Sequence, residues 1–235
     1  YKIVSWWAHK IKNPRLFGRL CWLALWWSRT PFGSFNGQLS KISAPQLAAY
    51  AIGDLVSELK INQEIIDEVI LGNVLSAGIG QAPARQASIN AGLSNTIECL
   101  TINKMCGSGL KSVMLGTQSI CSNSSNVAIA GGMENMSLVP HYVKHVRTGI
   151  RLGNTELIDG MVYDGLLDAY KKIHMGVCAE MCAEKYKLSR SEQDDYAISS
   201  YEKSQKAIND GIFNHEISPI TIDQKGKKII ISNCS

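Results

Sequence analysis

No stretch of this sequence stays apolar for the roughly 18 residues that a helix needs to cross a bilayer. The first 53 residues also lack aspartate and glutamate altogether, although they hold seven lysine and arginine residues. The net charge of +4 therefore originates in this segment, and the remainder of the chain is slightly acidic. From these absences we expect no membrane span and no nucleic-acid-binding surface in the body of the protein.

Disulfide and zinc motifs are lacking as well. The seven cysteines do not show the spacing of a disulfide framework, which favours a reducing compartment. Cys178 and Cys182 lie four residues apart in a segment expected to be helical, but no pair of histidine and cysteine completes a zinc site. We therefore expect these two cysteines to pack in a core, and we expect no metal site.

What the sequence does contain is an alternation of strand-like and helix-like segments, in a chain with 45% hydrophobic residues. Ser43 and Pro45 are typical of a helix start, and the apolar residues that follow have helical spacing. Parallel strands with right-handed crossovers, and hence a layered α/β fold, are expected from the succession of segments that follows: strand 69–71, helix 82–93, strand 97–103, helix 110–120 and a strand from 127.

The second half of the sequence has a different character. Residues 140–169 show little sustained periodicity and are typical of an elaborate insertion. Two helices are expected at 176–187 and 189–210, and the second begins with a capping-box pattern at Ser189 and Glu192. An apolar strand at 229–231 closes the chain.

Cys106 stands where the strand at 97–103 turns into a helix, so we expect it in the first turn of that helix. Free backbone N–H groups and the positive end of the helix dipole favour a thiolate, and the same groups can hold an oxyanion. Gly107 and Gly109 would let a substrate approach the backbone closely. An isolated cysteine is also commonly a small buried hydrophobe, so this window alone leaves both readings open.

Five segments, in order, carry a resemblance to a known family. They are Arg-Thr-Pro-Phe-Gly at 29–33, Gly-Gln-Ala-Pro-Ala-Arg-Gln at 80–86, Asn-Lys-Met-Cys-Gly-Ser-Gly at 103–109, Gly-Gly-Met-Glu-Asn-Met-Ser at 131–137 and His-Met-Gly at 174–176. Between about residues 28 and 231 the sequence resembles the thiolases, and more narrowly the acetyl-CoA acetyltransferases. The resemblance implies a thiolase-like layered α/β fold, made of an N-terminal α/β unit plus part of the loop domain that covers coenzyme A.

The resemblance also implies three segments. Residues 28–135 would form the N-terminal domain with the nucleophile, and residues 136–235 a partial loop domain. Residues 1–27 fit neither, because they are basic and hold all five tryptophans. Ile3-Val4-Ser5 is similar to the family's first strand, so our leading hypothesis is that residues 6–27 are a foreign insertion; a targeting segment and a genuine structural insertion are the alternatives.

For function, the resemblance implies an acetyl-CoA C-acetyltransferase that condenses two acetyl-CoA into acetoacetyl-CoA through an acetyl-cysteine at Cys106. Leu166, His174 and Met175 would line the coenzyme A site, and Glu134 would anchor neighbouring backbone. The Gly131 and Gly132 pair would allow close backbone packing. A coenzyme A thioester is the expected substrate, with no prosthetic group. Relatives lead us to expect a homo-oligomer, a dimer of dimers, in the cytoplasm, with mitochondria as the alternative.

Family features that are not recognisable in this sequence leave other functions open. They are the activating histidine, an Asn-Glu-Ala-Phe segment and a Cys-x-Gly cysteine, for which Cys234 lacks the glycine context. We therefore expect a nucleophile-bearing half of an enzyme that is inactive alone and exposes apolar surface. One alternative is a truncated, inactive protein that binds coenzyme A or partner subunits; another is a β-ketoacyl synthase, which the segments at 131–137 and 174–176 disfavour.

Overall fold

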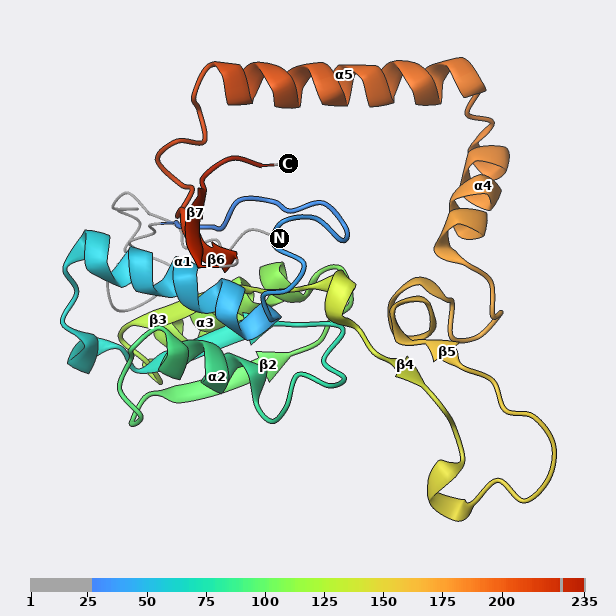
Figure 1. Cartoon of the computed structure of the whole chain (residues 1–235). Coiled ribbons are helices and arrows are strands. Elements are labelled where there is room, and N and C mark those ends of the chain that lie inside the picture. Colours follow the sequence, from blue (N-terminus) through green and yellow to red (C-terminus); the bar gives the residue numbers. More distant parts are fainter. Residues whose placement is uncertain (1–26, 225, 235) are drawn as a thin grey trace. The chain divides into compact units, whose positions relative to one another are not determined.

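The computed structural model describes residues 27–224 and 226–234, and the expectations about residues 1–26 lie outside this part of the chain. The described residues divide into two compact units (Figure 1). Unit 1 comprises the residues up to Pro140 together with those from Glu216 onward, and unit 2 comprises His141–His215. Unit 1 thus continues past residue 135, the boundary expected from the sequence, and it also takes in the last strands of the chain.

Unit 1 is built on a parallel sheet with the strand order β2–β1–β3. Glu68 of the central strand lies opposite Glu98 on one side and Ala128 on the other. Helices make the crossovers between the strands, as the alternating pattern predicts. The elements are α1 (Ala44–Leu59), η1 (Gln63–Ile65), β1 (Glu68–Gly72), α2 (Pro83–Asn90), β2 (Glu98–Ile102), α3 (Ser108–Cys121), β3 (Ala128–Gly132) and η2 (Met136–Leu138). The expected layered α/β fold is confirmed.

Helix α1 begins where its sequence signals place it. Ser43 is the N-cap, and its hydroxyl accepts a hydrogen bond from the backbone N–H of Gln46 at 3.4 Å. Pro45 occupies the first turn, where its missing N–H group costs no hydrogen bond. The helix ends at Leu59, and the left-handed backbone of its C-cap Lys60 (φ 50°) directs the N–H groups of Lys60 and Ile61 to carbonyls of the last turn, both at 3.2 Å.

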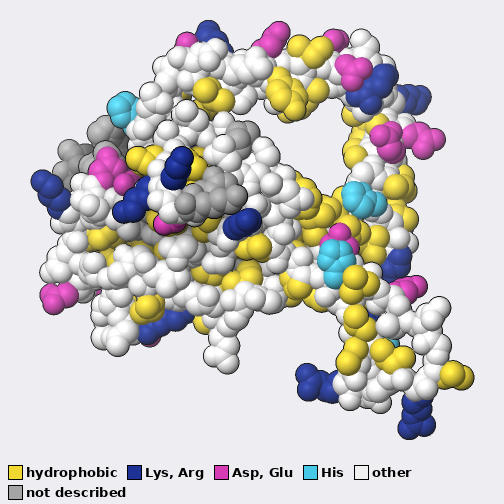
Figure 2. Space-filling view, viewed as in Figure 1, with side chains coloured by type: hydrophobic (Ala, Val, Ile, Leu, Met, Phe, Trp, Pro, Cys, Tyr) yellow, Lys and Arg dark blue, Asp and Glu magenta, His cyan; other side chains and the backbone are white. Residues whose placement is uncertain are grey.

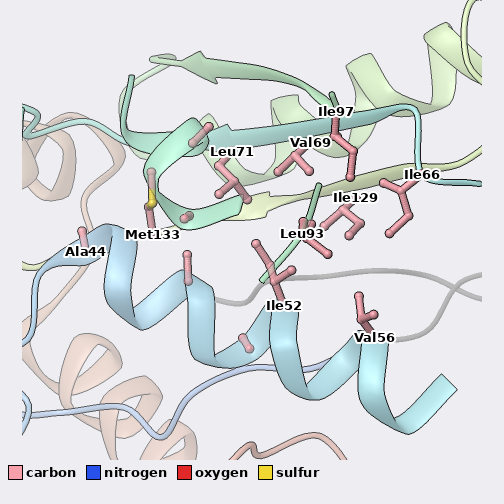
Figure 3. Packing of buried hydrophobic residues seen from close by; sticks show 14 residues of the cluster. Ala44, Ile52, Val56, Ile66, Val69, Leu71, Leu93, Ile97, Ile129 and Met133 are labelled. Atoms are coloured by element: carbon pink, nitrogen blue, oxygen red, sulfur yellow. The ribbon is translucent and has the colours of Figure 1, made fainter. Parts of the chain in front are cut away.

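Helices α1 and α2 cover one face of the sheet and form the main core with it. Ile52 and Val56 of α1 lie against Val69 and Leu71 of β1 and Ile129 of β3 (Figure 3). Alternate residues of each strand point to this face, so the strands contribute every second side chain to the cluster. Burial of these aliphatic side chains stabilises the unit by roughly 1.5–3 kcal/mol each.

The opposite face of the sheet carries α3, whose outer side is exposed. Gly116 packs against Ala130, so the helix lies close to β3. Leu110 and Met114 are 70% and 49% exposed, and Leu100 of the neighbouring edge strand is 44% exposed. Large apolar side chains are thus left uncovered on this side of unit 1, which confirms the expected exposure of apolar surface.

Arg29 joins the two chain segments that make up unit 1, because it bonds to residues of the C-terminal segment. Its N–H group donates to the carbonyl of Glu216 at 2.8 Å, and its carbonyl accepts from the N–H of Ser218 at 2.8 Å. Its buried guanidinium also pairs with the Glu216 carboxylate at 2.5 Å. The chain then forms an antiparallel pair, β6 (Ile220–Gln224) with β7 (Lys227–Ile231). The strand expected at 229–231 is confirmed, and its partner β6 was not anticipated from the sequence.

Unit 2 is dominated by two helices that bury little. Its elements are β4 (His141–Tyr142), η3 (Val146–Thr148), β5 (Ile158–Asp159), the π-helical turn η4 (Val162–Leu166), α4 (Met175–Tyr186) and α5 (Arg190–Asn209). Both bonds of the predicted capping box between Ser189 and Glu192 are present at the start of α5. Neither α4 nor α5 has a buried residue, and Figure 2 shows hydrophobic side chains on the surface of both helices.

No helix in the described ranges is both long enough and apolar enough to span a membrane. Cys178 and Cys182 lie on α4, where Cys178 is half-buried and Cys182 exposed. The core packing expected for this pair is therefore not present in unit 2. Among the side chains that the structure describes, no group of three or more histidine, cysteine, aspartate or glutamate residues is arranged to hold a metal ion.

Candidate active site

Cys106 lies in the short turn between β2 and α3, and it is exposed. Helix α3 begins at Ser108 with Gly107 as its N-cap, so the cysteine precedes the first helical turn by two residues instead of lying within it. The expectation was wrong by this amount because the backbone before Ser108 is not helical: Met105 has φ 46° and Gly107 has φ −95° and ψ 8°. Gly107 brings no side chain to the helix start, so no side-chain cap competes for the first N–H groups.

The turn that carries Cys106 is tightly bonded. The buried Ser108 hydroxyl accepts from the N–H of Lys104 at 2.9 Å and donates to the carbonyl of Met105 at 2.6 Å. Backbone bonds from Gly107 to Lys104 and from Ser108 to Met105, at 3.1 and 3.0 Å, close it further. Met105 has a left-handed backbone with φ 46°, a conformation that L-residues with side chains seldom adopt. The nucleophile candidate is thus held on a strained, well-defined turn.

Glycines let α3 approach the strand ends beneath this turn. A Cβ on Gly72, at the end of β1, would lie 2.5 Å from the backbone carbon of Ser108. A Cβ on Gly132 would lie 3.1 Å from the Cα of Gly109, which confirms the close packing expected at Gly132. Gly131 contributes its carbonyl, which accepts the Ser112 hydroxyl at 2.6 Å. Gly109 serves this helix-to-strand contact, a role that sequence reasoning assigned instead to substrate approach.

Glu134 follows β3 and binds the backbone that follows β1. Its Oε2 accepts the N–H of Val74 at 2.9 Å, and its Oε1 accepts the N–H of Leu75 at 3.2 Å and the Asn73 side-chain amide at 2.9 Å. Burial raises the pKa of Glu134, although these three donors act in the opposite direction. The anchoring role suggested by the resemblance therefore agrees with these bonds.

Leu166, His174 and Met175 are brought together within unit 2. Leu167 and His174 form an antiparallel bridge, so the residues beside them, Leu166 and Met175, flank the same junction. His174 is also the N-cap of α4, because its Nδ1 accepts the N–H of Gly176 at 3.0 Å. A neutral imidazole that accepts at Nδ1 carries its proton on Nε2, so His174 is arranged to donate a hydrogen bond from that atom.

The π-helical turn that ends at Leu166 is fixed by two polar pairs. The Tyr142 hydroxyl donates to the Asp164 carboxylate at 2.5 Å, and Lys144 donates to the Tyr163 hydroxyl at 2.6 Å. Burial and the neighbouring Asp164 raise the pKa of Tyr142 to about 12. Single π-helical turns within proteins commonly mark functional positions, which suits a residue expected to line a ligand.

A cavity of about 320 Å³ opens elsewhere in unit 1. Phe32, Phe35, Leu39 and Met133 are among its apolar lining residues, and Cys106 does not line it. None of the described residues that line the cavity is a cysteine or a histidine. Size alone therefore does not locate the chemistry of this unit, and the exposed turn at Cys106 remains the candidate site.

Sequence reasoning missed three side chains that shape this turn: Ser108, Asn103 and Asn73. Asn103 follows the pattern of an Asx turn, in which an asparagine accepts the N–H group two residues later. That local signal could have been read from the sequence. The partnership of Asn73 with Glu134 could not, because the two residues lie 61 positions apart.

The chain also matches known proteins. The thiolase N-terminal domain profile matches residues 26–233. Over 195 residues, 83% of this chain and 49% of the relative, the sequence is 48% identical to the cytosolic acetyl-CoA acetyltransferase ERG10 of Gibberella zeae. It is 49% identical over 198 residues to the acetyl-CoA acetyltransferase of Pseudomonas aeruginosa, covering 84% and 50% of the two chains. A mitochondrial acetyl-CoA acetyltransferase of Aspergillus fumigatus, erg10A, is 49% identical over 201 residues, covering 86% and 46%.

The chain spans about half the length of the curated relatives it matches. The matched region includes the parallel sheet, the turn with Cys106 and both helices of unit 2. A profile match over most of the chain, together with relatives near half identity, settles its descent. The chain belongs to the thiolase family and contains its N-terminal domain.

Proposed function

We propose that Cys106 is the nucleophile of an acetyl-CoA C-acetyltransferase, which condenses two acetyl-CoA into acetoacetyl-CoA and coenzyme A and also catalyses the reverse thiolysis. The observation that carries this proposal is the exposed cysteine on the strained turn between β2 and α3. The names of relatives at 48–49% identity support the choice of substrate.

The proposed reaction proceeds in two stages. The Cys106 thiolate attacks the acetyl-CoA carbonyl, and the bond to the coenzyme A sulfur breaks, which leaves an acetyl-cysteine. A second acetyl-CoA, which has lost a proton from its methyl carbon, then attacks this acetyl group and releases the Cys106 thiolate. The coenzyme A thiolate released in the first stage gains one proton, which balances the proton lost from the methyl carbon, so the products are acetoacetyl-CoA and coenzyme A. Backbone N–H groups at the turn would stabilise the oxyanion of each stage. A coenzyme A thioester is the substrate, and the chemistry as proposed requires no prosthetic group.

Leu166, His174 and Met175 are proposed to contact the coenzyme. Their shared place at the Leu167–His174 bridge supports a common ligand. His174 would donate a hydrogen bond from Nε2 to a carbonyl oxygen of the pantetheine arm, since Nδ1 is occupied by Gly176. Its role is therefore binding, and we do not assign it the task of removing the proton from Cys106.

For the whole protein, we propose a homo-oligomer, a dimer of dimers, located in the cytoplasm. The absence of disulfide-like cysteine spacing supports a reducing compartment. Matches to relatives named cytosolic and mitochondrial support both the cytoplasm and, as the alternative, mitochondria.

A second candidate is a protein of the same fold that binds coenzyme A or a partner subunit without catalysis. The observation that favours it is that residues 27–140 and 216–234, which form the described part of unit 1, contain no histidine. This described part of unit 1 therefore does not itself supply an imidazole to activate Cys106.

Incubation of the whole protein that contains this chain with acetyl-CoA, followed by mass spectrometry of its peptides, tests the proposal. We expect an acetyl adduct on Cys106 and none on Cys121, which lies at the far end of the same helix. The Cys106→Ser variant should lose the adduct. Equal labelling of both cysteines would indicate nonspecific thiol acetylation and contradict the proposal. Binding of coenzyme A without any adduct would favour the second candidate.

A further inference from the structure

The backbone after β1 is connected to the turn that carries Cys106 through one side chain, that of Asn103. Its Nδ2 donates to the carbonyl of Val74 at 3.2 Å, and its Oδ1 accepts the N–H of Met105 at 2.9 Å. The amide thus bonds at both ends, one end to a neighbouring loop and the other to the residue directly before the cysteine.

The position of Val74 is fixed by Glu134, which follows a different strand, β3. The N–H group of Val74 donates to the Glu134 carboxylate at 2.9 Å, and Asn73 is bonded to the same carboxylate. The N–H of Asn73 donates to the carbonyl of Ile102 at 3.0 Å, so the end of β2 is fixed to this loop as well. The Val74 carbonyl is therefore a rigid acceptor, and Asn103 is bonded to the scaffold formed by the three strand ends.

This arrangement is maintained against two unfavourable features. Met105 keeps a left-handed backbone, which glycine would adopt without penalty. The Oδ1 atom of Asn73 is buried without a hydrogen-bond partner in the described part of the protein. Strained or unsatisfied groups of this kind persist where the surrounding structure fixes a functional geometry.

We infer that Asn103 is a positioning residue for Cys106: its amide stabilises the left-handed conformation of Met105, and that conformation sets the place of the sulfur at the start of α3. Glu134 acts one step earlier, because it fixes the Val74 carbonyl to which Asn103 donates. This inference deepens the proposed function and rests on it for the meaning of Cys106, but the geometry can be tested without coenzyme A.

The test measures alkylation of the purified chain by iodoacetamide, with the rate at Cys106 divided by the rate at Cys121 from peptide mass spectrometry. Asn103→Ala removes both amide bonds, and we expect this ratio to fall at least about fivefold, the population change that loss of one neutral hydrogen bond produces. Asn103→Asp keeps an acceptor for the N–H of Met105 but loses the donor to Val74. Its alkylation ratio should therefore lie between that of the unsubstituted chain and that of Asn103→Ala.

A matched control is Asn62→Ala. Asn62 makes the same kind of turn, with Oδ1 accepting the N–H of Glu64 at 3.1 Å, at the distant element η1. Its removal should leave the ratio unchanged. A fall of the same size in this variant would overturn the inference, because it would indicate general loosening of unit 1.

The decisive variant combines Asn103→Ala with Met105→Gly. Glycine adopts positive φ readily, so it should restore the ratio to within about threefold of the unsubstituted chain, an effect that a general packing defect would not show. An unchanged ratio in Asn103→Ala, or no recovery in the double variant, would overturn the inference. Acetylation by acetyl-CoA is measured separately on each variant. If the whole unsubstituted protein takes no acetyl group while the alkylation pattern of the chain holds, the proposed function fails and the positioning role stands.

Discussion

Gly72 lies at the tightest contact between the sheet and the helix that follows Cys106, so its replacement by alanine should be severe. The new Cβ would lie 2.5 Å from the backbone of Ser108, and about 0.9 Å of separation is needed to reach an ordinary contact of 3.4 Å. Backbone on both sides prevents relief by a side-chain rotation. Overpacking of this kind costs about 1–3 kcal/mol, and we expect the upper end of that range.

Gly109→Ala is the matched comparison, since this glycine lies on the same contact. Its Cβ would be 3.6 Å from Gly132, an ordinary van der Waals distance. An alanine in the helix gains up to about 1 kcal/mol in helix propensity, so the variant should be neutral or slightly more stable. Two substitutions of the same chemistry on one interface thus have opposite expected effects.

Urea unfolding followed by far-UV circular dichroism measures both variants, with the midpoint and slope fitted separately. Gly72→Ala should lower the free energy of unfolding by about 2–3 kcal/mol, and it should also change the alkylation rate of Cys106, because the start of α3 must move. Equal stability of Gly72→Ala and the unsubstituted chain would refute the claim that the sheet and helix backbones are in rigid contact.

Three further variants test other parts of the fold. Replacing Arg29 by methionine removes the cation that pairs with the largely buried Glu216 carboxylate. The free energy of unfolding in urea should therefore fall by about 3–5 kcal/mol. A loss below about 1 kcal/mol would show that the ion pair is dispensable. Hydrogen bonds from the backbone N–H groups of Val127 and Asn126 lower the pKa of Asp67. The ionised carboxylate therefore stabilises the folded state at pH values above its ordinary pKa, and this stabilisation is lost as the pH falls through the lowered pKa. The stability difference between the unsubstituted chain and the Asp67→Asn variant should therefore shrink as the pH falls below about 4, and a constant difference would contradict this cause. Ser189→Ala removes the N-cap of α5 and should cost about 1 kcal/mol with loss of helical circular dichroism signal; an unchanged spectrum would mean that packing, and not the cap, maintains the helix.

Much of unit 1 could be predicted because its signals are local. The cap at Ser43 and the apolar strand at 69–71 depend on neighbouring residues only, and both are present in the structure. Cys106 was placed in the first turn of α3 although it precedes that turn by two residues, because the left-handed backbone of Met105 is not encoded by the apolar pattern on either side. Strand β6 was missed because its residues form a strand only in combination with β7, and this pairing cannot be inferred from the β6 segment alone.

The site was predictable to a different extent. Cys106 could be found because the strand, the glycines and the helix pattern are contiguous in sequence. The bonds that hold its turn join Glu134 to Val74, 60 positions away, and no local pattern encodes such a partnership. The coenzyme A contacts predicted for Leu166, His174 and Met175 rest on resemblance alone, and the structure adds only that the bridge between Leu167 and His174 places Leu166 and Met175 beside the same junction.

The pairing of Arg29 with Glu216 has a consequence for the timing of biosynthesis. The two residues are 187 positions apart, and a ribosome adds about 5–20 residues per second, so roughly 10–40 s pass between the synthesis of one partner and that of the other. During this interval all of unit 2 is synthesised, and Leu39 cannot yet pack against Ile220 and Ile231, with which it forms a buried cluster in the folded protein. The nascent chain therefore presents an unfinished apolar surface for many seconds before unit 1 can close.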